Sequence, residues 1–439
     1  MIGPEALANT VATSVGAAST ATGIGSFAGG FRATADGRNS IAMSDLSLAY
    51  GKGSVAIGER SLAGSTDINS VVKSDEERFS TAVGANAVAA AKQSTAMGYN
   101  AHALELDSLA INNGATAFSK ESIAIGKDSV AGGAGKDTPT PGALEAIAIG
   151  SGAIAQEVQG IAIGSGAVSR GSQGTAIGYN AHALEQDSLA INNGATAFSK
   201  ESIAIGNDAV AGGIDKNKAT TGARRAVAIG GGAVAKDYQG TAIGYKAEAK
   251  NTGDVAIGAM SKTPDTIKYT ESYNINGEDR TFTGGKNISV MGVASIGDTK
   301  SRILTGVAAG QISTVSTDAV NGSQLHRVIE EINKGVVFTD SYGGSATNRF
   351  GKNNTVATGD AVTDGDFTGK NLKAVVAAGD AGETTIKLMM NKSPEFENIT
   401  ASKISFGAGG PSITNAGIDA GGKVITNVGD GNIAAGSKD

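Results

Sequence analysis

The segment of this sequence that most resembles a chemical site is rich in glycine. Residues 146–155 read AIAIGSGAIA, which mimics a strand followed by Gly-x-Gly-x-x-Ala, the fingerprint that binds the pyrophosphate of a dinucleotide. That chemistry requires a helix directly after the glycines, within a βαβ unit of about 30 residues. Here the pattern instead recurs at once, at 160–169 and again at 174–183, with no helical pattern between the copies. We therefore expect no cofactor.

The titratable residues also lack the spacing of a catalytic or metal site. His102 and His182 hold equivalent places in two copies of one segment, and a threefold assembly would gather three of each, as in a metal site. No carboxylate recurs beside them, so we expect solvated surface histidines, with His326 on a helix surface. The acidic cluster at 75–78 is expected to be a solvated loop. The sequence thus predicts a protein that is not an enzyme and has no metal site.

Composition argues against a compact enzyme. The 439 residues include 65 Gly, no Trp, no Cys and only 4% aromatic residues, so small aliphatic side chains must be buried along a thin body or against other chains. The net charge is −6 with Lys and Arg spread along the chain, which gives no reason to expect a nucleic-acid partner. There is no apolar run of membrane-spanning length and no signal-peptide pattern at the start.

An internal repeat with a period of fourteen positions organises the first half of the chain. The segment 98–126 occurs again at 178–206 with one change, Leu106 to Gln186, inside a larger duplication. Three insertions interrupt the period, after the blocks that begin at 54, 122 and 202. Blocks reading approximately Ser/Gly-x-Ala-Ile-Gly begin at residues 40, 54, 80, 94, 108, 122, 146, 160, 174, 188, 202, 226, 240 and 254.

Each repeat predicts two short strands. The third block position is always Ala and the fifth is mostly Gly or Asn, which tolerate the positive φ of a turn. Parallel stacking of such units gives a β-solenoid, in which Val55 and Ile57 point one way and Ala56 the other. Both faces are apolar, so we expect a homo-oligomer; which face lines the roll stays open. Calcium-binding rolls have a period of nine, and an ice-binding face needs a regular Thr row, so neither alternative fits.

The second half contains signals of a different kind. Residues 263–302 predict a hairpin excursion with an Asn276-Gly277 turn, and Leu325, Ile329, Ile332 and Val336 form a short coiled-coil seam. The head repeats, followed by VAAG…STDAVNGSQL at 307–325, resemble trimeric autotransporter adhesins of Gram-negative bacteria, with a YadA-like head and neck.

That resemblance implies a fold and an assembly. The fold class is all-β: a left-handed parallel β-roll in a homotrimer, followed by a neck, a short coiled coil and small β-rich stalk domains. It implies neck and trimerisation roles for Asp318, Ala319, Val320, Asn321, Leu325, Ile329 and Ile332. It also implies an outer-membrane anchor beyond the end of this sequence, so we expect an excised piece of a bacterial cell-surface protein whose only link to the membrane is that anchor.

The expected boundaries follow these signals. The segment after the coiled coil resembles a Trp-ring stalk domain without its Trp, and the last segment resembles a GIN module running into a second neck, from Val428 to Asp439. The expected domains are 1–39 (start of the head), 40–262 (head), 263–302 (excursion), 303–325 (neck), 326–336 (coiled coil), 337–398 (stalk β-domain) and 399–439 (GIN-like module).

Candidate ligand contacts come from one motif and from the insertions. Related heads carry Asn-Ser-Val-Ala-Ile-Gly-x-x-Ser, which is associated with collagen binding; here Gly53 and Glu121 replace the leading Asn, and the roll itself needs the same residues. The two matches comprise Ser54, Val55, Ala56, Ile57, Gly58 and Ser61, and Ser122, Ile123, Ala124, Ile125, Gly126 and Ser129. The insertions at 64–79, 132–145 and 212–225 are favoured for recognition because solenoid excursions carry binding faces. Their candidates are Asp75, Glu76, Arg78, Lys136, Lys216 and Lys218.

The predicted function is attachment without catalysis. The expected partners are host extracellular-matrix proteins, host-cell surface receptors or other bacteria, as in biofilm and coaggregation, bound by a homotrimer. The alternative is a structural spacer of a surface fibre, with binding located elsewhere in the parent protein.

Overall fold

The structure is a computed structural model. It describes residues 2–9, 11–65, 78–268, 270, 272–275, 278–282, 291–340, 344–358, 371–378, 384–396, 398–426 and 429. The chain forms two compact units, residues 1–305 with 314–316, and residues 306–313 with 317–439. Among the described residues, no helix has the length and apolar character needed to cross a membrane.

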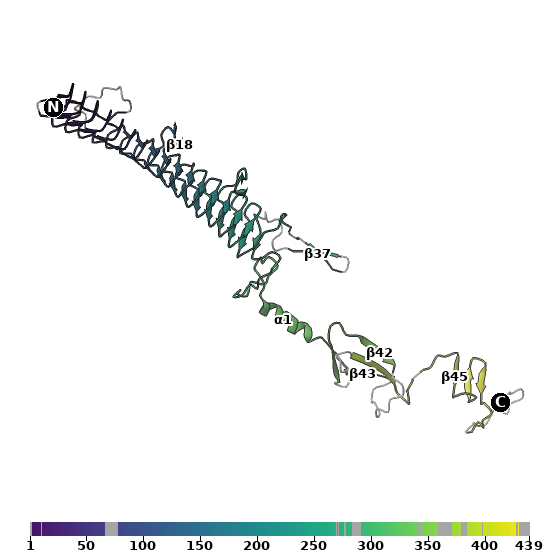
Figure 1. Cartoon of the computed structure of the whole chain (residues 1–439). Coiled ribbons are helices and arrows are strands. Elements are labelled where there is room, and N and C mark those ends of the chain that lie inside the picture. Colours follow the sequence, from purple (N-terminus) through teal and green to yellow (C-terminus); the bar gives the residue numbers. More distant parts are fainter. Residues whose placement is uncertain are drawn as a thin grey trace. The chain divides into compact units, whose positions relative to one another are not determined.

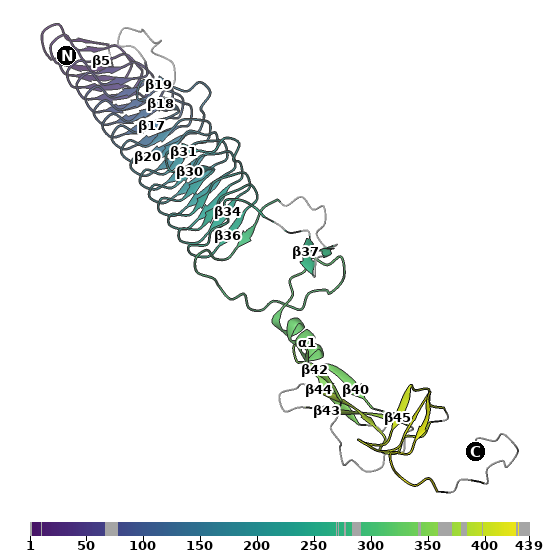
Figure 2. The ribbon, with the colours of Figure 1, turned by 90° about the vertical axis from the view of Figure 1, so that its right-hand side faces the viewer.

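The first unit is a parallel β-solenoid, as predicted (Figures 1 and 2). Each coil contributes a strand of three residues to one sheet and a strand of two residues to a second sheet, and each strand pairs in parallel with its counterpart in the next coil. The first sheet consists of β2 (Thr13–Val15), β4 (Phe27–Gly29), β6 (Ile41–Met43), β8 (Val55–Ile57), β10 (Thr81–Val83), β12 (Thr95–Met97), β14 (Leu109–Ile111), β16 (Ile123–Ile125), β20 (Ile147–Ile149), β22 (Ile161–Ile163), β24 (Thr175–Ile177), β26 (Leu189–Ile191), β28 (Ile203–Ile205), β32 (Val227–Ile229), β34 (Thr241–Ile243), β36 (Val255–Ile257) and β39 (Ala294–Ser295). The second consists of β1 (Leu7–Ala8), β3 (Thr20–Ala21), β5 (Thr34–Ala35), β7 (Leu48–Ala49), β9 (Leu62–Ala63), β11 (Val88–Ala89), β13 (His102–Ala103), β15 (Thr116–Ala117), β17 (Val130–Ala131), β21 (Ile154–Ala155), β23 (Val168–Ser169), β25 (His182–Ala183), β27 (Thr196–Ala197), β29 (Val210–Ala211), β33 (Val234–Ala235) and β35 (Glu248–Ala249).

Two full coils and part of a third precede the first block recognised in the sequence. Ser14 of β2 pairs with Ala28 of β4, which pairs in turn with Ala42 of β6, so further blocks begin at residues 12 and 26. The pattern is hidden there because Ser14 replaces the third-position Ala in one block and Gly29 replaces the fourth-position aliphatic residue in the other. The solenoid therefore includes part of the segment described above only as the start of the head.

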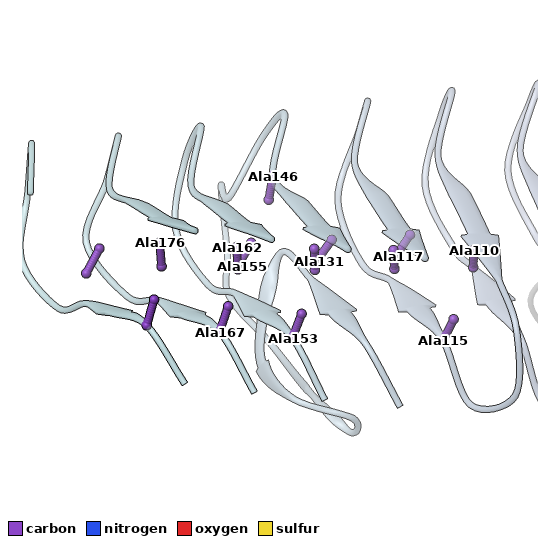
Figure 3. Close-up of a cluster of buried hydrophobic side chains, with 14 of the residues drawn as sticks. Ala110, Ala115, Ala117, Ala131, Ala146, Ala153, Ala155, Ala162, Ala167 and Ala176 are labelled. Carbon is purple, nitrogen blue, oxygen red and sulfur yellow. The ribbon is translucent and has the colours of Figure 1, made fainter. Parts of the chain in front are cut away.

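The apolar core inside the roll is built from alanine, and buried serines accompany it. Ala110 of β14 and Ala117 of β15 are fully buried, and Figure 3 shows them among alanines gathered between the two sheets. Ile123 and Ile125, on either side of Ala124 in β16, are only partly buried. The alanine face therefore lines the roll and the larger side chains point outward, which answers the question the pattern leaves open. The sheets lie so close that a methyl group fills the space between them.

The turn after most first-sheet strands carries glycine, because φ is positive there and the turns stack directly on one another; Ser44, Asn112 and Asn192 hold the same place in three coils. Gly126 has a φ of +132°, and a Cβ built there would lie 2.5 Å from the carbonyl oxygen of Gly150 in the next coil. Gly206 in the second copy has a φ of +129° and faces Gly230 in the same way. A side chain at either place would meet backbone that cannot yield.

The last block of the repeat begins with a buried aspartate. Asp254 occupies the block position where Ser122 and Ser202 stand in earlier coils, and it is fully buried. Its carboxylate accepts hydrogen bonds from the backbone N–H and the Nδ2 of Asn251, both at 2.9 Å, and from the Val293 N–H at 2.8 Å. These bonds draw β39 onto β36 as one more strand of the first sheet. Asp254 thus helps close the C-terminal end of the roll.

Three hairpins leave the roll in the part of the chain that the structure describes. β18 (Gly133–Gly135) pairs with β19 (Thr138–Pro139), and β30 (Gly213–Asp215) pairs with β31 (Lys218–Ala219). The predicted excursion is also a hairpin, of β37 (Ser272–Ile275) and β38 (Glu278–Thr281); its Asn276-Gly277 turn lies outside the described residues.

The second unit contains one helix and eight short strands within the described residues. The helix is α1 (Gly322–Asn333). The strands form an antiparallel pair, a mixed sheet in the order β42-β44-β43, and an antiparallel sheet in the order β45-β46-β47. They are β40 (Val336–Thr339), β41 (Ser345–Asn348), β42 (Asn354–Thr358), β43 (Leu372–Ala378), β44 (Thr384–Met390), β45 (Lys403–Ser405), β46 (Ser412–Thr414) and β47 (Gly417–Asp419). Most of the segment expected to begin a second neck, including Val428 and Asp439, lies outside the described residues.

Candidate functional site

The motif residues proposed for ligand contact are mostly inside the roll. Six of them are fully buried: Ser54, Ala56 and Ser61 in one match, and Ser122, Ala124 and Ser129 in the other. Ser122 and Ser129 donate hydrogen bonds to the carbonyls of Ser119 at 2.5 Å and Gly126 at 2.9 Å, so they hold turns together. Gly58 and Gly126 form the stacked turns themselves. Only Val55, Ile57, Ile123 and Ile125 reach the outer face.

That outer face of the first sheet is apolar and incompletely covered. Side chains at its two outward positions are partly buried in most coils, and some are well exposed, including Met43 at 43% and Met97 at 45%. Stacked in register, they form a continuous apolar stripe along the roll. Such a stripe is typical of a protein interface rather than of a small-molecule site.

The two described insertions are hairpins fixed to the roll at their bases. In the first, Gly132 donates to the carbonyl of Ala155 at 2.8 Å, and Thr140 donates to that of Gly132 at 2.9 Å. Gly212 and Thr220 repeat both bonds in the second. Lys136, Lys216 and Lys218 are exposed on these hairpins, available to a partner.

The remaining insertion is only partly described. Asp75 and Glu76 lie outside the described residues, while the Nη1 of Arg78 donates to the carbonyl of Ala90 at 3.3 Å. Arg78 therefore ties the end of this insertion to the roll.

Two of the three histidines are not the solvated residues that we expected, whereas His326 is exposed on α1, as expected. His102 and His182 are half-buried on the outer side of the second sheet. Burial lowers the pKa of His102, with a further lowering by Lys136 of the hairpin and an opposing effect of Asp137. Burial, assisted by Arg170, lowers the pKa of His182. The described residues contain no group of three or more His, Cys, Asp or Glu able to hold a metal ion.

The neck motif has a clear structural use in a single chain. Asn321 caps α1 and forms a capping box with Gln324, and its Nδ2 donates to the carbonyl of Val307 at 3.0 Å. Gln324 exchanges hydrogen bonds with the backbone of Gly310, at 2.7 and 3.1 Å. Asp318 accepts from the Gln311 N–H at 2.9 Å. The polar residues of the motif thus fasten the chain before the helix onto its first turn.

The apolar residues of the neck and helix have no such partners. α1 has no buried residue, and its predicted seam is open to solvent in the single chain. The exposed fractions are 64% for Val320, 56% for Leu325, 44% for Ile329 and 48% for Ile332. An isolated helix of 12 residues is marginally stable in water, so its apolar face needs a partner.

Sequence reasoning missed a cavity at the end of the roll, of about 670 Å³. Glu248 in its wall pairs with Lys236 at 2.5 Å and with Lys262 at 3.4 Å. Arg302 donates to Ser261 Oγ at 2.9 Å and to the carbonyls of Ile296 and Ala259. The Arg302 bonds tie the returning chain to the last coils. No sequence signal marks them, because Arg302 lies far beyond Ser261 along the chain.

Comparison with known families agrees with the repeat and the neck. The YadA head domain repeat matches residues 21–43, 79–101, 143–167, 169–191, 222–247 and 238–261. The coiled stalk of trimeric autotransporter adhesin matches residues 304–348. These segments of the chain match the head repeat and the coiled stalk of trimeric autotransporter adhesins. The first head match begins at residue 21, consistent with the early coils.

Two curated adhesins are similar to this chain. Autotransporter adhesin BtaE of Brucella suis biovar 1 (strain 1330) is 34% identical over 221 residues, 49% of this chain and 28% of BtaE. Autotransporter adhesin BadA of Bartonella henselae is 34% identical over 150 residues, 33% of this chain and 4% of BadA. The chain therefore spans only a small part of either relative.

Two solved structures are also similar to this chain. The collagen-binding domain of the Yersinia adhesin YadA is 23% identical, covers 57% of this chain and 83% of its own, and has a TM-score of 0.21. The C-terminal YadA-like domain of BPSL2063 from Burkholderia pseudomallei is 36% identical, covers 24% and 42%, and has a TM-score of 0.19.

Proposed function

We propose that this chain is the head and the beginning of the stalk of a non-enzymatic adhesin, displayed as a homotrimer on the surface of a Gram-negative bacterium. The head and stalk matches and the two curated relatives, both autotransporter adhesins, support this function. The proposed partners are host extracellular-matrix proteins, host-cell receptors or other bacteria.

The observation that carries the proposal is a pair of uncovered apolar surfaces. One is the outer stripe of the first sheet, and the other is the face of α1 that carries Leu325, Ile329 and Ile332. Packing three rolls along the stripe and three helices along the seam would remove both surfaces from water. At about 25 cal/mol per Å² of apolar area, such burial is a strong drive to associate.

We place recognition on the hairpins, because the trimer would leave them free. The same hairpin is then presented three times on one rigid body, so weak individual contacts gain avidity. The interior alanines serve the roll, and the outer stripe, with the outward residues of the collagen-type motif, serves the trimer interface.

Two deletions test this assignment without changing the 14-residue repeat of the roll. Removing residues 134–143 and 214–223 restores the regular period of the repeat at both insertions. The variant should remain trimeric and should bind less well to immobilised matrix proteins, epithelial cells or partner bacteria. Equal binding by both proteins would refute the role of the hairpins. An intact chain that binds none of these surfaces would favour the structural spacer.

A further inference from the structure

The corners between the two sheets form a continuous edge that carries side chains outward. In each coil, two residues at this corner precede the first-sheet strand, and successive corners are joined by backbone hydrogen bonds. The Arg225 N–H donates to the carbonyl of Lys200 at 3.1 Å, and the Gln239 N–H donates to that of Arg224 at 2.9 Å. We call the stacked pairs 200–201, 224–225 and 238–239 the second corner edge.

The first copy of the duplication builds the same edge on the same bonds. There the Glu145 N–H donates to the carbonyl of Lys120 at 3.0 Å, and the Gln159 N–H donates to that of Leu144 at 2.8 Å. We call the pairs 120–121, 144–145 and 158–159 the first corner edge. Because the backbone is the same, the two edges differ only in what their side chains offer a partner.

The first corner edge has no excess of positive charge. Lys120 pairs with Glu121 at 2.9 Å. Glu145 accepts a hydrogen bond from Gln159 at 3.1 Å, and Leu144 is 43% exposed. The attached insertion, residues 132–145, has one Lys against Asp137 and Glu145.

The second corner edge is strongly cationic. Arg224 and Arg225 replace Leu144 and Glu145, and both are exposed. Arg225 Nε donates to the carboxylate of Glu201 at 2.7 Å. The hydrogen bond from Arg225 lowers the pKa of Glu201 most, and the charges of Arg225, Lys200 and Arg224 lower it further. The Glu201 carboxylate thus lies among three cationic side chains, those of Lys200, Arg224 and Arg225.

The neighbouring hairpin adds to this charge. Lys216 and Lys218 are exposed on β30–β31, and the insertion at 212–225 has four basic residues against Asp215 alone. The hairpin is anchored beside the next coil through the bond from Gly212 to Ala235 at 2.8 Å. These cations belong to a chain whose net charge is −6, so the patch is a local exception.

The arrangement suits an extended anionic chain that also has rings to stack. Lys200 and Arg224 lie one coil apart, about 4.8 Å along the edge, close to the length of one sugar ring. Arginine recognises carboxylate and sulfate oxygens in a bidentate manner. Tyr238 in the next corner is half-buried beside Arg225 and offers a partly exposed aromatic ring. Asp237, next to Tyr238 in the same corner, would repel the dense phosphates of a nucleic-acid duplex.

We propose that the second corner edge, with the hairpin β30–β31, binds an acidic polysaccharide, and that the first corner edge does not. This inference rests on the proposed adhesin function, for which it names a partner class and a place. Because the contacts are electrostatic, binding should weaken as salt concentration rises.

The duplication supplies matched variants for the test. The double variant Arg224→Leu/Arg225→Glu places the first copy's own residues in the second, and Leu144→Arg/Glu145→Arg makes the reverse exchange. Neither exchange touches the interior, so both proteins should fold and assemble as the natural chain does. The probes are polygalacturonate, which carries only carboxylates, and heparin, which adds sulfates; double-stranded DNA and poly-glutamate are run in parallel.

The natural chain should bind at least one polysaccharide, and more tightly than it binds DNA or poly-glutamate. Arg224→Leu/Arg225→Glu should weaken that binding about tenfold or more, since it removes two charge-assisted contacts and adds a repulsive charge. Leu144→Arg/Glu145→Arg should increase the amount bound. Unchanged binding by the first variant, equal or tighter binding to DNA or poly-glutamate, or no binding to either polysaccharide would overturn the inference.

The outcomes also separate this inference from the proposed function. A trimeric chain that adheres to matrix proteins or cells but ignores both polysaccharides would refute the inference alone. A natural chain that is monomeric would refute the proposed function whatever it binds.

Discussion

The two copies of the duplicated segment agree inside the roll and differ on its edge. Residues 98–126 and 178–206 differ at one position, while the insertions that follow them, 132–145 and 212–225, differ at eight of their fourteen positions. The interior is fixed by contact, because Ala124 and Ala204 are fully buried and Gly126 and Gly206 face backbone of the next coil. The hairpins and corners meet solvent. Packing therefore restricts which residues the interior of the repeat can have, while the hairpins and corners can carry residues that suit a partner.

The largest expected effect comes from a change at the stacked turns. Gly126→Ala and Gly206→Ala should each lower the free energy of unfolding by roughly 3 kcal/mol or more, because a positive φ and a clash with backbone act together. The matched controls are Gly142→Ala and Gly222→Ala, where φ is +79° and +81° but no atom lies within 4 Å of the new Cβ. These should cost about 1 kcal/mol. Urea unfolding of the four variants measures the difference; equal costs at turns and insertions would contradict it.

A smaller effect is expected where the repeat ends. Asp254→Ala leaves the N–H groups of Asn251 and Val293 without their buried acceptor and should cost about 2 kcal/mol. Ser202→Ala, at the equivalent position of a body coil, should cost about 1 kcal/mol, since it removes two neutral hydrogen bonds, of which the one from the Ser199 N–H is long at 3.3 Å. Thermal unfolding compares the two, and a larger loss at Ser202 would show that Asp254 does not close the roll.

Low pH should reduce the stability that the Asp254 carboxylate contributes. Burial opposes ionisation of Asp254, but hydrogen bonds from Thr263, Val293 and Asn251 outweigh it and lower the pKa of this carboxyl. The folded state thus favours the charged form. Its contribution is complete above about pH 3.9 and is lost as pH falls through the lowered pKa. The stability difference between the natural chain and Asp254→Ala should therefore shrink in acid; a difference that grows would contradict this sign.

The smallest expected effect concerns the half-buried histidines. Their pKa values are lowered in the folded roll, so the folded state favours neutral imidazole. The stability is then complete above about pH 6.5, the value of an unfolded histidine, and declines as pH falls below it. The double variant His102→Gln/His182→Gln should lose less stability between pH 8 and pH 5.5 than the natural chain. An equal loss in both proteins would place the pH dependence elsewhere.

Much of the fold follows from the sequence because its signals are local. Alternation around Ala110 predicts a strand, and Gly or Asn after it predicts a turn, so the coil can be inferred from a single repeat. The blocks at 12 and 26 are not recognised in the sequence because Ser14 and Gly29 break the pattern, although the strand register continues through them. Which face of each strand points into the roll does not follow from the sequence, because both faces are apolar. The short distance between the two sheets is what selects alanine for the interior.

The candidate sites were less predictable because they depend on contacts between distant residues. The exposure of Lys136, Lys216 and Lys218 agrees with their placement in insertions. By contrast, the pKa of His102 is influenced by Lys136 of a hairpin that begins two coils later, and Asp254 is held by Val293, 39 residues away. The motif serines were misleading for another reason: the hydroxyls that resemble ligand contacts are used to close turns.

The account depends most directly on the association of three chains through the apolar stripe and the helix seam. Light scattering coupled to size-exclusion chromatography measures the mass of the intact protein in solution. The account predicts three times the chain mass of 43.4 kDa, across a wide range of protein concentrations. A stable species of 43.4 kDa with its full β-structure would contradict it, because both apolar surfaces would then be left in water.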